Sequence, residues 1–281
     1  MKKVTKRKRT IRRTRRFGRL FRILGLLALV VCLFRFLGDG AEIPQPPAWQ
    51  GTGEKERPAT EAKAADAVPG LTDRISRIFF FKQAVNSHLR KEDYVPIEEI
   101  SPDLCHAIVA VEDNRFYSHS GFDLTGIARA SLVNLQYGQI EEGASTITQQ
   151  LVKNLFLSHE QTFGRKAEEL LLALDMEANY SKEEILELYL NTIYFGSNFY
   201  GIGPASQGYF GKEPKELELS EAAMLAGLPN APSLYSPYVD FIMAKKRQFI
   251  VLDAMERYGY ISGESAEDAK IKPIYLARKE E

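Results

Sequence analysis

The chain has 281 residues, of which 44% are hydrophobic and 26% are charged. A chain of this length can bury one core of good size with a smaller lobe beside it, which excludes two separate enzyme domains. The formal net charge is zero, but thirteen of the 37 Lys and Arg residues precede the first acid, Asp39. The remainder is therefore acidic, with 24 basic against 37 acidic residues.

The basic residues run directly into an apolar segment, 20–37, which is interrupted only near its ends by Arg22, Gly25 and Arg35. About 20 apolar residues span a bilayer, and terminal arginines can reach the headgroups, so we expect a membrane partner and no nucleic acid. The positive-inside rule makes 1–19 a basic cytoplasmic tail and places the rest outside. A cleaved signal peptide is the alternative. We predict an uncleaved anchor, because Arg35 interrupts the apolar run and no small-residue cleavage site follows.

Residues 38–70 are rich in Pro, Ala, Gly and Glu and predict a flexible linker before a domain at 71–281. The segment 71–89 is compatible with either a strand or a helix. Cys32 and Cys105 form neither a disulfide framework nor a metal-type spacing, so core packing must hold the domain together.

From residue 101 onward the hydrophobic periodicity is almost wholly helical, and strand signals are sparse. We therefore predict a mainly α domain. Ser181 and Glu184 have the capping-box form ahead of one helix. The predicted helices cover 101–112, 123–138, 146–156, 163–178, 181–193, 220–228 and 240–258, and a last short one begins at 262.

The end of the first of these helices places a carboxylate where an apolar residue is expected. Ser101 can serve as the N-cap and Pro102 fits the first helical position, which fixes the register. At about 100° per residue, Glu112 falls on the apolar face, whereas Asp113 projects to the other side near His106. The apolar face is formed by Leu104, Cys105, Ile108 and Val111.

A carboxylate held against apolar surface loses hydration, which raises its pKa toward neutral pH. Glu112 is therefore a candidate general base or acid. The alternative is a structural carboxylate at the helix end, satisfied by Arg115 or by a loop amide.

A second candidate site is the glycine-containing turn at 143–146, which precedes a helix bearing Gln150 and Lys153. Free backbone N–H groups at such a helix start favour anions, phosphate included. The alternative is that Ser145 or Thr146 merely caps the helix.

The helix 163–178 is the third candidate. Arg165 and Glu169 lie on a line that continues through Leu172 and Met176, roughly opposite an apolar stripe. A solvated ion pair is the usual explanation of such residues, whereas a second covered face indicates the wall of a cleft. The predicted apolar stripe consists of Phe163, Ala167, Leu170, Leu171, Leu174 and Ala178.

Four motifs then follow in order: 112–121 (EDNRFYSHSG), 143–150 (GASTITQQ), 165–169 (RKAEE) and 182–191 (KEEILELYLN). Together they resemble the motifs of the peptidoglycan glycosyltransferases, glycosyltransferase family 51, which class A penicillin-binding proteins and monofunctional transglycosylases share. The segments 209–212 (YFGK), 221–223 (EAA) and 229–232 (PNAP) extend a likeness that covers roughly 73–258. The chain lacks the Ser-x-x-Lys nucleophile of a transpeptidase, so it resembles the monofunctional form.

The resemblance implies a lysozyme-like helical domain with a smaller mobile lobe, held by one N-terminal transmembrane helix at a bacterial plasma membrane. It implies polymerisation of lipid II by inverting glycosyl transfer, with release of undecaprenyl pyrophosphate and inhibition by moenomycin. The implied partners are lipid II, the lipid-linked glycan chain, the membrane and other cell-wall synthesis proteins.

The resemblance also implies roles for individual residues. Glu112 would be the base, and Glu169 would orient cations or help to hold a divalent ion such as Mg²⁺ or Mn²⁺. Asp113 would belong to the substrate-binding residues and, with His119, brace the turn after Glu112. Arg129 would meet a phosphate. The pyrophosphate would be bound by Lys153, Arg165 and Lys166, with Ser145, Gln149, Gln150 and Asn154 as hydrogen-bonding partners.

Tyr189, Asn191 and Glu187 are expected to pack and pin helices. The sequence departs from the family pattern at Gln161, Glu168 and Ser206, of which Gln161 bears on pyrophosphate binding.

Two other functions fit parts of the pattern. A muramidase or lytic transglycosylase can also use one buried Glu in a helical domain, but its reaction leaves no pyrophosphate for Lys153 and Arg165 to stabilise. A non-catalytic, membrane-tethered scaffold would not need acids at both Glu112 and Glu169.

Overall fold

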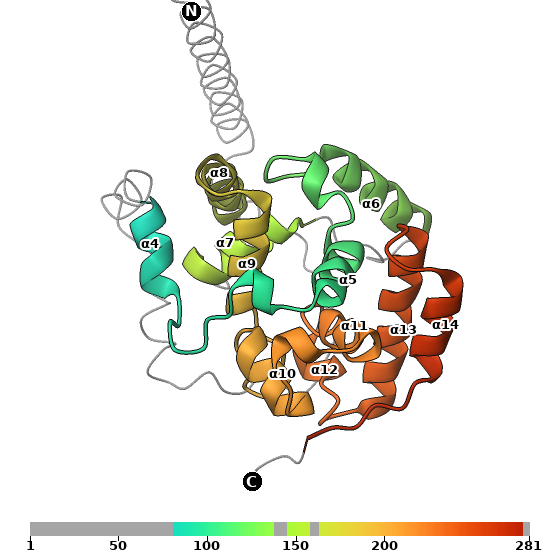
Figure 1. Cartoon of the computed structure of the whole chain (residues 1–281). Helices are drawn as coiled ribbons and strands as arrows, with labels where there is room; N and C mark the ends of the chain where they lie inside the picture. The colour runs from blue at the N-terminus through green and yellow to red at the C-terminus, as the bar shows by residue number, and fades with distance from the viewer. Residues whose placement is uncertain (1–80, 138–144, 158–162, 278–281) are drawn as a thin grey trace, which may run out of the picture. The chain divides into compact units, whose positions relative to one another are not determined.

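The computed structural model describes residues 81–137, 145–157 and 163–277 (Figure 1). They belong to two compact units, of which the smaller contains 160–168 and the larger contains 46–159 and 169–281. The predicted tail, anchor and linker lie outside the described residues, as does Gln161. None of the described helices is both long and apolar enough to cross a bilayer.

The mainly α prediction is confirmed, since the only β pairing in the described ranges is an isolated bridge between Tyr194 and Tyr200. Part of the undecided segment, 81–88, is a helix. The α-helices are α4 (Phe81–His88), α5 (Pro102–Glu112), α6 (Leu124–Tyr137), α7 (Ile147–Phe156), α8 (Phe163–Asn179), α9 (Lys182–Thr192), α10 (Ile202–Phe210), α11 (Leu219–Gly227), α12 (Pro232–Tyr235), α13 (Phe241–Arg257) and α14 (Gly263–Ile271). Short 3₁₀ turns lie at Ile97–Glu99, Phe116–Ser118 and Pro214–Glu216.

Several helix starts follow from side chains that accept hydrogen bonds from free backbone N–H groups. Thr146 forms a capping box with Gln149, and the predicted box at Ser181 is present. Asp240 accepts from the backbone N–H groups of the two residues that follow Phe241. Ser101 is the N-cap residue of α5, as predicted, but its hydroxyl donates to the carbonyl of Leu217 at 3.1 Å and does not cap the helix.

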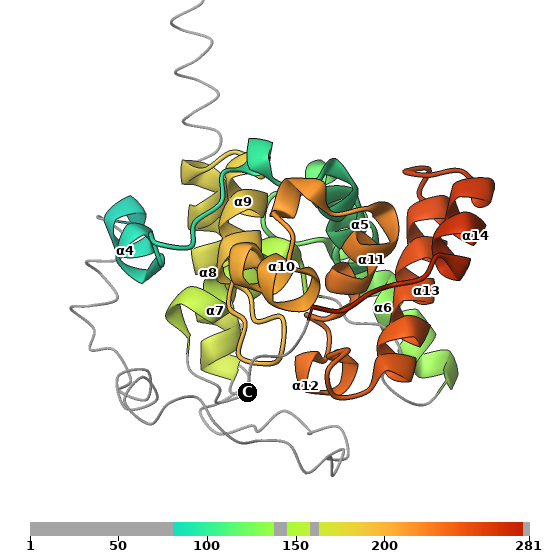
Figure 2. The same cartoon turned by 60° about the horizontal axis from the view of Figure 1, so that its bottom comes forward.

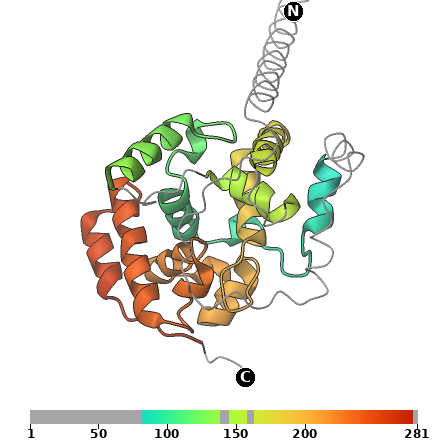
Figure 3. The same cartoon turned by 180° about the vertical axis from the view of Figure 1, so that it is seen from behind.

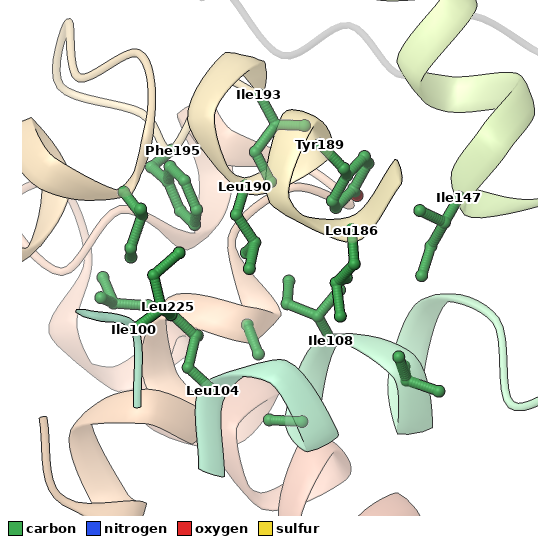
Figure 4. Close-up of a cluster of buried hydrophobic side chains, with 14 of the residues drawn as sticks. Ile100, Leu104, Ile108, Ile147, Leu186, Tyr189, Leu190, Ile193, Phe195 and Leu225 are labelled. Carbon is green, nitrogen blue, oxygen red and sulfur yellow. The ribbon is translucent and has the colours of Figure 1, made fainter. Parts of the chain in front are cut away.

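α5 is the central helix of the larger unit and carries Glu112 at its C-terminal end. It packs against α11 and α13, while α14 lies beside α13 (Figure 2) and α7 pairs with α9 (Figure 3). Figure 4 shows the core that these elements enclose. Its labelled side chains are Ile100, Leu104, Ile108, Ile147, Leu186, Tyr189, Leu190, Ile193, Phe195 and Leu225. Full burial of each aliphatic side chain stabilises the fold by about 1.5–3 kcal/mol.

Polar side chains of α9 hold the segment that leads into α5, as predicted for the pinning residues. Glu187 accepts hydrogen bonds from the hydroxyl of Tyr94 at 2.5 Å and from the backbone N–H of Ile97 at 2.7 Å. Asn191 both accepts from and donates to the backbone of Val95, each at 2.8 Å. The start of α5 is thereby fixed against α9.

In the part of α8 that lies in the larger unit, the second covered face that the sequence left open is confirmed. The buried residues there are Glu169, Leu172, Ala173 and Met176, which follow the i, i+3, i+4, i+7 spacing of one helix face. Leu170, Leu171 and Leu174 of the predicted apolar stripe are half-buried, and the side that carries Glu169 is the more deeply buried one. Glu169 is only 2% exposed, so a solvated ion pair does not describe it.

Gly196 lies where the loop after α9 meets α12, and we expect Gly196→Ala to destabilise the fold by about 3 kcal/mol. Its φ is +83°, and an added Cβ would lie 2.6 Å from the carbonyl oxygen of Pro232. Gly259→Ala is the matched control, because Gly259 has φ +77° but nothing within 4 Å of its Cβ position. That control should lose about 1 kcal/mol. Equal losses in urea denaturation would show that the contact with Pro232 is unimportant.

Candidate active site

The carboxyl group of Glu112 is buried, with 8% of its side chain exposed. Oε2 accepts a hydrogen bond from Nε2 of Gln150 at 2.9 Å. Oε1 accepts none from the described part of the chain, and Nη2 of Arg247 lies 3.9 Å from it. Burial raises the pKa of Glu112 above the ordinary glutamate value, although the hydrogen bond from Gln150 and the charges of Arg247 and Lys153 oppose the shift. The inward orientation predicted for Glu112 is confirmed.

Gln150 is held in turn by Tyr189, whose hydroxyl donates to Oε1 of Gln150 at 3.1 Å. Tyr189 is fully buried on α9. Because the amide oxygen is fixed in this way, the amide NH₂ group of Gln150 is directed at Glu112. Two residues, Gln150 of α7 and Tyr189 of α9, thus set the orientation of the Glu112 carboxylate at the end of α5.

Tyr189→Phe should therefore reduce kcat by about ten-fold through loss of orientation. It should also lower the free energy of unfolding by about 1 kcal/mol, because the amide oxygen of Gln150 loses its donor. Tyr194→Phe is the control, because the Tyr194 hydroxyl accepts a hydrogen bond from the backbone N–H of Asn198 in an exposed turn. If steady-state kinetics gave the same kcat for the two variants, Tyr189 would have no orienting role.

Asp113 is buried rather than outward, so the prediction of its direction is wrong. Its carboxylate contacts Nε2 of His119 at 2.9 Å and accepts a hydrogen bond from the backbone N–H of Ile147 at 3.1 Å. α5 ends at Glu112, and Asp113 has φ −158° and ψ 75°, so the helical period no longer applies to it. His106 instead stacks on Tyr260. The predicted bracing of the turn by Asp113 and His119 is confirmed.

A pocket of about 390 Å³ opens beside Glu112. The walls come from the end of α5, from α6, from the start of α7, from the loop after α11 and from α13. Its charged lining residues are Glu112, Asp113, Asp123, Arg129, Arg247, Asp253 and Arg257. Ser145, Thr146 and Asn230 add polar groups. The site can therefore bind a polar, charged molecule next to a buried carboxylate.

The structure brings some of the predicted residues together and leaves others apart. Glu112, Asp113, Arg129 and Ser145 line the pocket. Gln149 closes the cap of α7, whereas Lys153 and Asn154 are exposed on that helix and do not line the pocket. Glu169 is not among the lining residues either. Arg165 and Lys166 belong to the smaller unit, so their position relative to Glu112 stays a prediction.

Sequence reasoning missed the contribution of α13, namely Arg247, Asp253 and Arg257. A signal was present. Arg247 follows Ala244 by three residues and precedes Val251 by four, so a cation occupies the core-facing stripe of the helix. No cluster of three or more His, Cys, Asp or Glu suited to a metal occurs within the described ranges.

The sequence also matches known proteins. The family model described as Transglycosylase matches residues 81–256. Penicillin-binding protein 1A of Aquifex aeolicus is 47% identical over 68% of this chain and 26% of its own length, and penicillin-binding protein 2D of Bacillus subtilis is 47% identical over 66% and 27%. The chain thus spans about a quarter of the length of these relatives.

A relative of similar size also matches. A putative transglycosylase of Cupriavidus necator is 44% identical over 69% of this chain and 83% of its own length. A solved structure of penicillin-binding protein 1A from Haemophilus influenzae is 27% identical over 66% of this chain and 18% of that chain, with a TM-score of 0.41. The family match and the relative from Cupriavidus necator show that the chain belongs to the transglycosylase family, glycosyltransferase family 51. It carries the peptidoglycan glycosyltransferase domain of that family.

Proposed function

We propose that this chain polymerises lipid II into linear peptidoglycan strands, with inversion at the anomeric carbon and release of undecaprenyl pyrophosphate. The observation that carries the proposal is the carboxyl group of Glu112. It is buried, it is oriented by Gln150, and one of its oxygens accepts no hydrogen bond from the described residues at the edge of a polar pocket. The family match supplies the class of reaction.

In the proposed step, a sugar hydroxyl of the acceptor lipid II attacks the anomeric carbon of the lipid-linked glycan. A new C–O bond forms, and the bond from that carbon to the pyrophosphate oxygen breaks with its electron pair. The hydroxyl proton passes to Oε1 of Glu112. A sugar hydroxyl is a poor nucleophile, so a base with a raised pKa is needed during the attack.

The departing pyrophosphate gathers negative charge that cations must offset in a partly dry cleft. We assign this role to Lys153, Arg165 and Lys166. Ser145, Gln149, Gln150 and Asn154 are the proposed hydrogen-bonding partners, with Arg129 at a second phosphate. Ser145 and Arg129 line the same pocket as Glu112, which supports their assignment.

Glu169 is proposed to orient those cations or to contribute a carboxylate to a divalent ion, Mg²⁺ or Mn²⁺, bound with the pyrophosphate. Such an ion would supply positive charge for the leaving group. A buried carboxylate needs a charged or hydrogen-bonding partner, which fits either role.

We place the enzyme at a bacterial plasma membrane, with its N-terminus in the cytoplasm and its catalytic domain outside. Substrate and product both carry polyprenyl chains. An anchor at 20–37 would confine enzyme and substrate to one thin layer and raise their effective concentration.

The test supplies the full-length protein in detergent or liposomes with purified lipid II and resolves the product by gel electrophoresis. Polymer formation that moenomycin blocks would support the proposal. Shortening of preformed glycan strands without synthesis would instead indicate a cleaving enzyme. The absence of both activities, in protein that melts cooperatively, would favour a scaffold.

A further inference from the structure

Arg247 is a buried cation held in place by the end of α11. Only 13% of its side chain is exposed. Its Nε donates a hydrogen bond to the carbonyl oxygen of Gly227 at 3.3 Å, and its guanidinium lies 5.5 Å from the ring centroid of Tyr235. A Cβ at position 227 would lie 2.7 Å from Cγ of Arg247, so the glycine makes room for the arginine stem.

The guanidinium of Arg247 faces Oε1 of Glu112, which is the oxygen that Gln150 does not contact. The distance of 3.9 Å from Nη2 to Oε1 is an electrostatic contact and is too long for a hydrogen bond. The charge of Arg247 therefore acts on the carboxylate without occupying the lone pairs of Oε1.

We propose that Arg247 is a positioning residue: fixed by Gly227 and Tyr235, it keeps Glu112 ionised while leaving Oε1 open to accept the proton. This inference rests on the proposed role of Glu112 in glycosyl transfer. Burial disfavours the ionised form that a base must take, and the charge of Arg247 opposes that effect.

Other groups that act on Glu112 do not replace this cation. Lys153 on α7 is exposed, so solvent screens its charge, whereas Arg247 is buried and is screened much less. Gln150 and Tyr189 are neutral hydrogen-bonding groups that orient the carboxylate, and Asp113 on the same segment carries a like charge that opposes ionisation.

The direct test titrates the carboxyl carbon of Glu112 by NMR in the full-length protein in detergent, with ¹³C-labelled glutamate. The signal is assigned by its absence in Glu112→Gln. Arg247→Gln should move the titration midpoint upward by about one pH unit. Arg247→Lys should move it less, since the charge remains. Lys246→Gln is the matched control, because it removes an exposed cation from the adjacent position of α13 and should leave the midpoint in place.

Gly227→Ala gives an independent variant, because it displaces Arg247 without removing its charge. It should shift the midpoint upward by less than Arg247→Gln does. An unshifted midpoint in Arg247→Gln, in protein that melts like the wild type, would overturn the proposal.

Polymerisation of lipid II supplies the second measurement. Arg247→Gln should move the acid limb of the pH profile of kcat upward by the same amount as the titration midpoint, so its loss is at most about ten-fold on the acid side and disappears at alkaline pH. An equal loss at every pH would overturn the proposal. The titration needs no substrate, so it separates the two claims. If Glu112→Gln polymerised at the wild-type rate, the proposed base would fail while the effect of Arg247 on the carboxyl was still measured.

Discussion

Glu112→Gln is expected to lower kcat for lipid II polymerisation by about 10²- to 10⁴-fold. Glutamine has the shape of the carboxylate and can keep the contact with Gln150, but its amide cannot accept the proton of the acceptor hydroxyl. Because the substitution changes neither volume nor fold, KM should change little. The measurement is the initial rate of polymer formation in detergent.

The same variant should be more stable than the wild type at neutral pH. The folded state raises the pKa of Glu112 above its unfolded value. The stabilising contribution of the Glu112 carboxyl is therefore fully present at pH below its pKa in the unfolded state. It is lost as the pH rises through its pKa in the folded state. A glutamine at position 112 does not ionise, so it does not lose this stability as the pH rises. Glu99→Gln, at an exposed acid paired with Lys215, is the control and should change neither rate nor stability. Full activity in Glu112→Gln would exclude the proposed base.

Asp113→Ala is expected to lower the free energy of unfolding by about 3 kcal/mol. The substitution removes the acceptor for the backbone N–H of Ile147 and for His119, and leaves both groups buried without that partner. The turn after α5 and the start of α7 would then shift. Since α7 carries Gln150, a displacement of about 1 Å should also reduce kcat by about 10²-fold.

Urea denaturation and steady-state kinetics measure both effects. Asp113→Asn should be intermediate, because its side-chain oxygen can still accept from Ile147. Asp103→Ala removes a partly exposed acid from the first turn of the same helix and should lose less than about 1 kcal/mol. If Asp113→Ala matched Asp103→Ala, the bracing role would be wrong.

The sequence predicts the features that depend on local chemistry. Helix type and many of the starts follow from short-range patterns, as the capping box at Ser181 and the start of α13 near residue 240 illustrate. Glu112 was also predicted to face inward, because its register is set by residues of its own helix. Such predictions need only the helical period and the preferences of capping residues.

Features that depend on tertiary contacts were predicted poorly. The helical period was extended one residue past the end of α5, and this placed Asp113 outward. The sequence of α8 allowed either a solvated ion pair or a second covered face at Glu169, and only the tertiary packing that buries Glu169 decides between them. Arg247 was missed because only the packing of α13 against α5 brings it to Glu112.

The pH dependence of kcat/KM for lipid II polymerisation by the wild-type protein tests the central claim most directly. If a buried carboxyl with a raised pKa takes the proton, activity must fall on the acid side with a midpoint above about 4.3, the ordinary value for glutamate. A rate that stays constant as pH falls through that ordinary value, in protein that remains folded, would contradict the account.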